Sequence, residues 1–126
     1  MKNKAKYVDG FVLVVSKKKT AEYSKMAREA KKVWMKFGAL SYRECMIDDA
    51  KPPLVTLIFP KLIKAKPSEN VWFSYIEYKS KAHRNQVNKA VMAYFDKKYS
   101  DADMSKDMPF DMKRIAFGGF KVVVSN

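Results

Sequence analysis

The stretch that decides the fold is WFSYIEYKSKAHRNQVNKAVM, residues 72–92. Its first half is rich in aromatic and β-branched residues, which predicts a strand over residues 71–79. Because the apolar residues of this strand lie on both of its faces, we expect both faces to be buried. Ser80 then predicts the N-cap of an amphipathic helix that runs to about Lys97. The apolar face of that helix comprises His83, Val87, Ala90, Val91 and Tyr94.

A similar strand and helix precede this stretch. Residues 7–16, YVDGFVLVVS, predict a first strand, in which Gly10 marks a bulge or a close backbone approach. Thr20 predicts the N-cap of a helix that runs to Phe37, with apolar residues at three-and-four spacing. Gly38 is the expected helix stop, because glycine adopts the left-handed conformation that commonly ends helices.

The second strand is predicted over residues 40–48, LSYRECMID. Alternation along a strand places Tyr42 and Glu44 on one face. It places Arg43 and Cys45 on the other face. One face of this strand therefore carries a tyrosine beside a carboxylate, which is the first candidate for a functional pair.

The remaining segments are less regular. Residues 54–59 are apolar and end at Pro60, which predicts either a short extra strand or an apolar lid. Residues 100–108 are acidic and turn-like. Residues 114–124 predict a fourth strand that contains Gly118–Gly119. This glycine pair lacks the spacing of a phosphate-binding loop, so we interpret it as backbone curvature or tight packing.

The predicted element order β-α-β-β-α-β indicates an α+β protein of ferredoxin-like architecture, an antiparallel sheet with both helices on one face. At 126 residues the chain predicts a single domain over residues 1–126. The strands remain apolar on the face that the helices do not cover, and bare apolar sheet faces of this size are rare. We therefore predict a homodimer, a dimeric α+β barrel in which two sheets pack face to face.

The chain carries a formal net charge of +13, with 26 basic and 13 acidic residues. Of the basic residues 22 are lysine and 4 are arginine, and the lysines are spread along the chain. Because base and phosphate recognition favours arginine, this composition argues against a nucleic-acid-binding protein. The alternative function, a non-enzymatic interaction protein that binds RNA or another polyanion, rests on the basic N-terminus and Lys17–Lys19.

Cellular location is predicted from cysteine content and hydropathy. Cys45 is the only cysteine, which excludes an intrachain disulfide and fits the reducing cytoplasm. The apolar runs are far shorter than the ~20 residues that span a bilayer, and residues 11–15 are too short for a signal peptide. We therefore expect a cytoplasmic protein with no membrane segment.

His83, the only histidine, is the first candidate catalytic residue. It lies in the first turn of a helix, on the apolar face, where the helix dipole favours a neutral imidazole. A neutral imidazole can act as a general base. The alternative is a structural histidine that caps the helix or packs against Tyr78.

Glu44 is the second candidate catalytic residue. A carboxylate in the middle of a strand needs a partner when it is buried, and the choices are Arg84, Arg114 or a tyrosine hydroxyl. The interpretation is either a structural pair or a carboxylate that orients a substrate. A pocket formed by both catalytic candidates would also include the binding candidates Tyr42, Tyr78, Arg84 and Arg114.

The sequence predicts neither a metal nor another cofactor. One cysteine and one histidine make a poor zinc set, and no pair has metal-site spacing. Cys45 has no neighbours that mark a reactive thiol. The expected ligand is a small apolar or aromatic molecule, although neither a reaction nor enzyme activity follows from these residues. A structural dimer without a ligand is also compatible with them.

The chain resembles the YbaA-like family of small uncharacterised bacterial proteins. The segments that carry the resemblance are YVDGFVLVV (7–15), KVWMKFGAL (32–40), YREC (42–45), FP (59–60), WFSYIEYKSKAHRNQVNKAVM (72–92) and MPFDMKRIAFGGFKVVV (108–124). The resemblance implies the dimeric α+β barrel superfamily, with a pocket between sheet and helices and relatives that include small monooxygenases and muconolactone-type enzymes. Cofactor-free oxygenation or isomerisation of an apolar compound is the activity class it implies.

Overall fold

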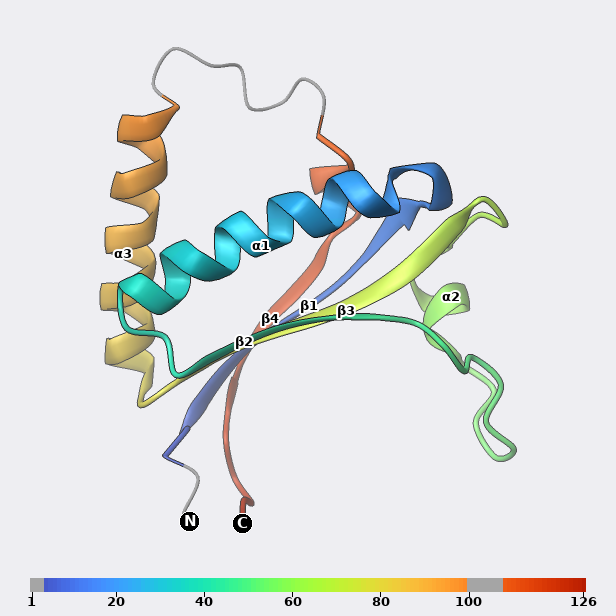
Figure 1. Cartoon of the computed structure of the whole chain (residues 1–126). Coiled ribbons are helices and arrows are strands. Elements are labelled where there is room, and N and C mark those ends of the chain that lie inside the picture. Colours follow the sequence, from blue (N-terminus) through green and yellow to red (C-terminus); the bar gives the residue numbers. More distant parts are fainter. Residues whose placement is uncertain (1–3, 100–107) are drawn as a thin grey trace.

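The computed structural model describes residues 4–99 and 108–126 and shows an α+β fold (Figure 1). Four strands form one sheet, in the order β2-β3-β1-β4, and every neighbouring pair is antiparallel. The strands are β1 (Tyr7–Ser16), β2 (Ser41–Met46), β3 (Glu69–Tyr78) and β4 (Ala116–Lys121). The helices are α1 (Thr20–Lys36), α2 (Phe59–Leu62) and α3 (Lys81–Lys98), with 3-10 turns at Lys17–Lys19 and Met112–Arg114.

Both long helices lie on the same side of the sheet, while α2 lies beyond its other side (Figure 1). The core between sheet and helices has two buried clusters. One joins Ile76 and Tyr78 of β3 to Val87 and Val91 of α3. The other joins Leu13, Val15 and Trp72 of the sheet to Tyr23 and Ala27 of α1. Strand geometry produces this layer, because alternate side chains of β1 and β3 point toward the helices.

Most predicted boundaries are confirmed. The first strand has the predicted bounds, and Gly38 ends α1 in the left-handed region at φ +111°. Ser80 caps α3 by accepting a hydrogen bond from the His83 backbone N–H at 3.0 Å. The second and fourth strands are shorter than predicted. The last strand ends at Lys121 because Lys121 pairs with Tyr7, where β1 begins.

The predicted N-cap at Thr20 is wrong. A 3-10 turn over Lys17–Lys19 leads directly into α1, so the cap position falls on Lys19, which makes no side-chain capping bond. The Thr20 hydroxyl instead donates to the Lys17 carbonyl at 2.8 Å.

The apolar segment over residues 54–59, which leads from β2 toward β3, contains no strand. Residues 54–58 are irregular, and Phe59 and Pro60 begin the short helix α2. The Phe59 ring lies 6.4 Å from the ring of Phe73, which points away from α1 and α3. The connection therefore lies against the uncovered face of the sheet. The acidic, turn-like segment predicted over residues 100–108 falls outside the described residues except for Met108.

The three strand glycines accommodate side chains that approach the sheet closely. Pairing of β1 with both neighbours is continuous through Gly10, so there is no bulge. A Cβ at Gly118 would lie 3.0 Å from the Phe120 ring, and one at Gly10 would lie 3.4 Å from it. On the helix side, a Cβ at Gly119 would lie 2.5 Å from the Tyr7 hydroxyl.

Candidate functional site

A cavity of about 1080 Å³ lies between the sheet and the helices. Its volume is at the upper end of the range for pockets that hold small molecules. The inward faces of all four strands line it together with α1, α3 and residues 108–115. Most of its wall is aromatic or aliphatic: Phe11, Leu13, Tyr23, Met26, Ala27, Ala30, Trp34, Tyr42, Ile76, Met92, Phe95, Tyr99, Met108, Phe110, Met112, Ile115 and Phe117.

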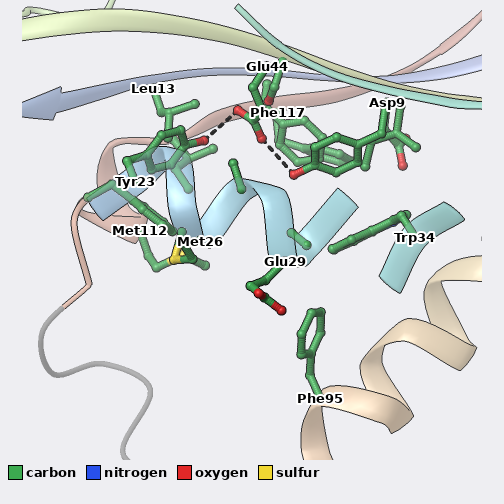
Figure 2. A pocket seen from close by; sticks show the side chains of 18 of the residues that line it. Asp9, Leu13, Tyr23, Met26, Glu29, Trp34, Glu44, Phe95, Met112 and Phe117 are labelled. Atoms are coloured by element: carbon green, nitrogen blue, oxygen red, sulfur yellow. Dashed lines mark hydrogen bonds between the residues drawn. The ribbon is translucent and has the colours of Figure 1, made fainter. Parts of the chain in front are cut away.

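Glu44 projects from β2 into this cavity and holds two tyrosine hydroxyls (Figure 2). Tyr23 of α1 donates to Oε1 at 2.7 Å, and Tyr42 donates to Oε2 at 2.8 Å. Burial raises the pKa of the Glu44 carboxyl, while hydrogen bonds from Tyr23, Tyr42 and Ser74 partly oppose the rise. Burial and the Glu44 charge also raise the pKa of both tyrosines, so they remain hydroxyl donors at neutral pH. Of the partners the sequence allowed, the tyrosine hydroxyls are the ones found.

Asp9 is a second carboxylate in the cavity wall, and it is only 1% exposed. Its Oδ1 accepts no hydrogen bond, and it makes an ion pair with Nε of Arg84 at 3.6 Å. Arg84 instead donates through Nη2 to the Tyr7 hydroxyl at 3.0 Å. Burial raises the pKa of Asp9, although the Arg84 charge and hydrogen bonds from Asn88 and Tyr78 oppose the rise.

The two carboxylates lie on strands that flank β3. Asp9 pairs with Ile76, and Glu44 pairs with Ser74. Their Cα atoms are separated by two inter-strand spacings across the sheet and by two residues along the strand direction, which amounts to roughly 12 Å. This separation is too large for the two groups to share a proton, so each carboxyl titrates in its own surroundings.

In the cavity wall, Asn88 of α3 links two aromatic side chains. Its Oδ1 accepts from the Tyr78 hydroxyl and from Nε1 of Trp34, both at 3.2 Å. Tyr78 is fully buried, and burial raises its pKa. It supports the wall without lining the cavity, whereas Trp34 and Asn88 do line it.

The structure does not bring His83 to this cavity. Its Nδ1 accepts a hydrogen bond from the Lys79 backbone N–H at 3.0 Å, and its ring packs edge-on against Tyr78 at 6.0 Å. A Cβ at Gly38 would lie 3.4 Å from Nε2, so the other nitrogen faces the end of α1. This is the geometry of the structural alternative, a residue that joins the end of β3 to the first turn of α3.

Arg114 also lies away from the two carboxylates. It makes a bidentate ion pair with Glu69, with Nη1 at 2.6 Å from Oε2 and Nη2 at 3.0 Å from Oε1. The same guanidinium donates to the Lys64 carbonyl at 3.0 Å. The Arg114–Glu69 ion pair therefore joins the 3-10 turn Met112–Arg114, before β4, to the start of β3. Among the predicted site residues, the structure brings Tyr42 and Glu44 together in the cavity, and places Tyr78 and Arg84 directly behind its wall.

Within residues 4–99 and 108–126, no group of three or more histidine, cysteine or acidic side chains could hold a metal ion. In the same part of the chain, no helix combines the length and apolarity needed to cross a bilayer. Cys45 is exposed, on the sheet face opposite the cavity.

Comparison with known proteins identifies the family. A family model described as "Protein of unknown function (DUF1428)" matches residues 6–112. The chain belongs to the DUF1428 family. It is 40% identical over 119 residues to the "Uncharacterized protein YbaA" of Escherichia coli strain K12, an alignment that covers 94% of this chain and 97% of that protein. The YbaA protein of Shigella flexneri matches with the same identity and coverage. The resemblance to YbaA-like proteins is thereby confirmed.

Sequence reasoning missed Asp9 as a site residue of this DUF1428 chain. A signal was present, because Asp9 shares its strand face with Leu13 and Val15, the face that must be buried. A lone carboxylate on a buried strand face is costly unless it has a use or a partner. Asn88 could not have been found in this way, because its neighbours on α3 are polar as well as apolar.

Proposed function

We propose that this DUF1428 protein binds a small apolar or aromatic molecule in the cavity between sheet and helices, with Glu44 as a general acid–base. One observation carries the proposal. A cavity of about 1080 Å³ with a mainly apolar wall contains a carboxyl group whose pKa is raised by burial. Large apolar pockets with a few convergent polar groups are the usual form of binding and active sites.

Glu44 has the surroundings that acid–base chemistry requires. A carboxyl with a raised pKa exchanges protons closer to neutral pH than an ordinary glutamate, so it can accept a proton from a bound molecule and return it. Tyr23 and Tyr42 fix both carboxyl oxygens and stabilise the charged form. Isomerisation by proton transfer fits this arrangement without a cofactor. Oxygenation would require dioxygen as a second substrate.

The other residues have positioning roles in this proposal. Arg84 holds Asp9 in the cavity wall, and Tyr78 positions Asn88. His83 as a catalytic residue and Arg114 as a binding residue stay predictions, and neither has a place in this mechanism. The single cysteine supports a cytoplasmic location as part of the same proposal.

We further propose that the fold is ferredoxin-like and that two copies form a dimeric α+β barrel. The strand order β2-β3-β1-β4 and the placement of both long helices on one face support the first part. Support for the second part comes from the face that α1 and α3 leave uncovered. On this face Phe73 is 43% exposed and Phe120 is 60% exposed.

A second copy is the occupant that fits this face. The face carries Arg43 and Glu77 near its aromatic residues, so it presents both signs of charge. A two-fold interface brings a surface against itself, which suits a patch that is apolar at its centre and mixed in charge around it. Burial against a second sheet would also satisfy the apolar character of both faces of β3.

Pocket binding is tested with a variant that fills the cavity. Ala30 lines the cavity from α1, so Ala30→Trp should occupy much of it. Ala21→Trp is the matched control, because Ala21 is exposed on the same helix and does not line the cavity. A library of small aromatic and aliphatic compounds is screened by thermal shift on the wild type and both variants. Binders should stabilise the wild type and Ala21→Trp but not Ala30→Trp. Compounds that stabilise all three proteins equally would place binding elsewhere and refute the proposal.

Polyanion binding is the second candidate function. The observation that favours it is the exposed lysine triplet Lys17–Lys19 on a chain of net charge +13. If it is correct, affinity for single-stranded RNA should fall steeply as salt rises, with a slope set by the number of phosphates contacted. The absence of RNA binding at 50 mM salt would exclude it.

A further inference from the structure

The charges of the cavity are opposite in sign to those of the chain as a whole. Four carboxylates line it among the described residues: Asp9, Glu29, Glu44 and Asp96. No lysine, arginine or histidine of the described chain does so, although basic residues outnumber acidic ones by 26 to 13. Glu29 on α1 and Asp96 on α3 are exposed, so they lie at the mouth. Asp9 and Glu44 come from the sheet, which forms the floor (Figure 2).

Glu44 has no cationic partner among the described residues. Its oxygens accept hydrogen bonds from the neutral hydroxyls of Tyr23, Tyr42 and Ser74. The two ion pairs in the described chain are Arg84–Asp9 and Arg114–Glu69. Glu44 is partly buried. A carboxylate withdrawn from water without a counter-charge is unfavourable, and a cation that enters with a ligand would relieve this cost.

Asp9 provides an independent observation that points to a ligand. Hydrogen bonds from Asn88 and Tyr78 lower the pKa of its carboxyl, yet Oδ1 is buried in the cavity wall without a hydrogen bond, and Arg84 Nε pairs with it only at 3.6 Å. Buried oxygens are nearly always hydrogen-bonded, so an acceptor left free in a cavity wall is expected to meet a donor from the ligand. The Oδ1 of Asp9 can therefore accept a hydrogen bond from a ligand, and Glu44, which already accepts hydrogen bonds from three hydroxyls, can pair with a ligand's positive charge.

The aromatic part of the wall suits the same kind of ligand. Trp34, Tyr42 and Phe95 line the cavity near Glu29 and Glu44, and Figure 2 shows the Phe95 ring beside the Glu29 side chain. Aromatic faces attract cations, most strongly where water is excluded, and they bind the apolar part of a ligand by ordinary packing.

We propose that the ligand of the cavity is a hydrophobic organic cation, an amine or quaternary ammonium that carries an apolar or aromatic group. This inference rests on the proposed function, since it names the ligand class of the same pocket. The cationic head pairs with Glu44 and contacts the aromatic wall, while the apolar part fills the region lined by methionines and aliphatic residues. The surface lysines do not prevent binding, because at 0.15 M salt charges are screened over about 8 Å.

The test uses three compounds of nearly equal shape. Phenyltrimethylammonium is a permanent cation, tert-butylbenzene is its neutral isostere, and 4-tert-butylphenol adds a neutral hydrogen-bond donor. Their affinities are measured by calorimetry at pH 8 on the wild type, Glu44→Gln and Ala30→Trp. Glu22→Gln is the matched control, because Glu22 is exposed on α1 and does not line the cavity.

The expected result is that the wild type prefers the cation over tert-butylbenzene by about tenfold or more, the gain typical of a partly desolvated cation beside an anion and aromatic faces. Glu44→Gln should remove most of this preference, and Glu22→Gln should keep it. Should Glu44→Gln fail to fold, Glu29→Gln at the mouth provides a second test, with an expected loss of about twofold for the cation alone.

Two results would overturn the inference in distinguishable ways. Equal or tighter binding of tert-butylbenzene or 4-tert-butylphenol, abolished by Ala30→Trp, would leave the pocket intact and exclude a cationic ligand. Failure of all three compounds to bind, or binding that Ala30→Trp leaves unchanged, would overturn the proposed pocket and the inference together.

Discussion

Replacement of Tyr23 by phenylalanine tests the link between Glu44 and its tyrosines. The substitution removes the hydroxyl that donates to Glu44 Oε1 at 2.7 Å. It keeps the ring, which packs edge-on against Trp72 and Phe110 at 4.8 and 5.8 Å. Any loss of stability can therefore be attributed to the hydrogen bond rather than to a cavity.

The size of the loss should depend on pH. A hydrogen bond to a charged group contributes about 1.5–3 kcal/mol, and a neutral one about 0.5–1.5 kcal/mol. We expect Tyr23→Phe to lower the free energy of unfolding by about 2 kcal/mol at pH 8.5, where Glu44 is ionised, and by about 1 kcal/mol at pH 4. The larger loss at pH 8.5 means that Tyr23→Phe raises the pKa of folded Glu44 further.

The direction of this pH dependence follows from proton linkage. Burial raises the pKa of folded Glu44 above its ordinary value of 4.5, so the unfolded chain loses this proton first. The contribution of Glu44 to stability therefore falls as pH rises from 4.5 through the folded pKa, and then stays constant. Because Tyr23→Phe raises the folded pKa further, the variant should show a larger fall than the wild type.

Urea denaturation, followed by circular dichroism, measures the loss in free energy of unfolding at pH 4 and at pH 8.5. Tyr75→Phe is the matched control, because Tyr75 lies on the opposite face of the sheet and should show no dependence on pH. In a Glu44→Gln background the pH dependence of Tyr23→Phe should disappear. Equal losses at the two pH values in the wild-type background would refute the reasoning.

Three further predictions concern the rest of the fold. Gly119→Ala should lower the free energy of unfolding by about 1–3 kcal/mol in urea denaturation, because its Cβ would meet the Tyr7 hydroxyl at 2.5 Å; unchanged stability would contradict this packing. His83→Ala should lower it by about 1 kcal/mol through loss of the Lys79 hydrogen bond. Calorimetry should find the ligand affinity of His83→Ala unchanged, and a tenfold loss of affinity would show that His83 belongs to the binding site. Phe73→Glu should convert a dimer to a monomer in light scattering, since Phe73 lies at the proposed interface; a dimer of undiminished stability would exclude that face.

The sequence predicted the regular part of the fold well, for identifiable reasons. The first strand is a run of ten residues rich in β-branched and aromatic side chains. Gly38 and Ser80 mark helix ends through conformation and capping that hardly depend on the rest of the chain. The N-cap prediction at Thr20 was wrong because the preceding lysines form a 3-10 turn that continues directly into the helix. The path of residues 54–70 depends on packing against Phe73 of the sheet. Such a tertiary contact leaves no signal in the local sequence pattern.

The candidate site was predicted in part. Alternation along β2 was enough to place Tyr42 and Glu44 on one face, and the structure joins them by a hydrogen bond of 2.8 Å. The second partner, Tyr23, comes from a helix and is brought there only by tertiary packing. His83 attracted attention as the only histidine, but its capping bond to Lys79 depends on the turn between β3 and α3. Rarity of a residue type is a weaker guide than its position on a buried face.

The central claim, a ligand-binding cavity between sheet and helices, is tested most directly by NMR of ¹³C-methyl methionines. Four methionines line the cavity: Met26, Met92, Met108 and Met112. Met35 and Met46 do not line it and serve as internal controls. On addition of phenyltrimethylammonium, or of any compound that stabilises the protein in the thermal screen, the four cavity methyl signals should shift together while the two controls stay fixed. Shifts confined to Met35 or Met46, with the cavity signals unmoved, would contradict the account.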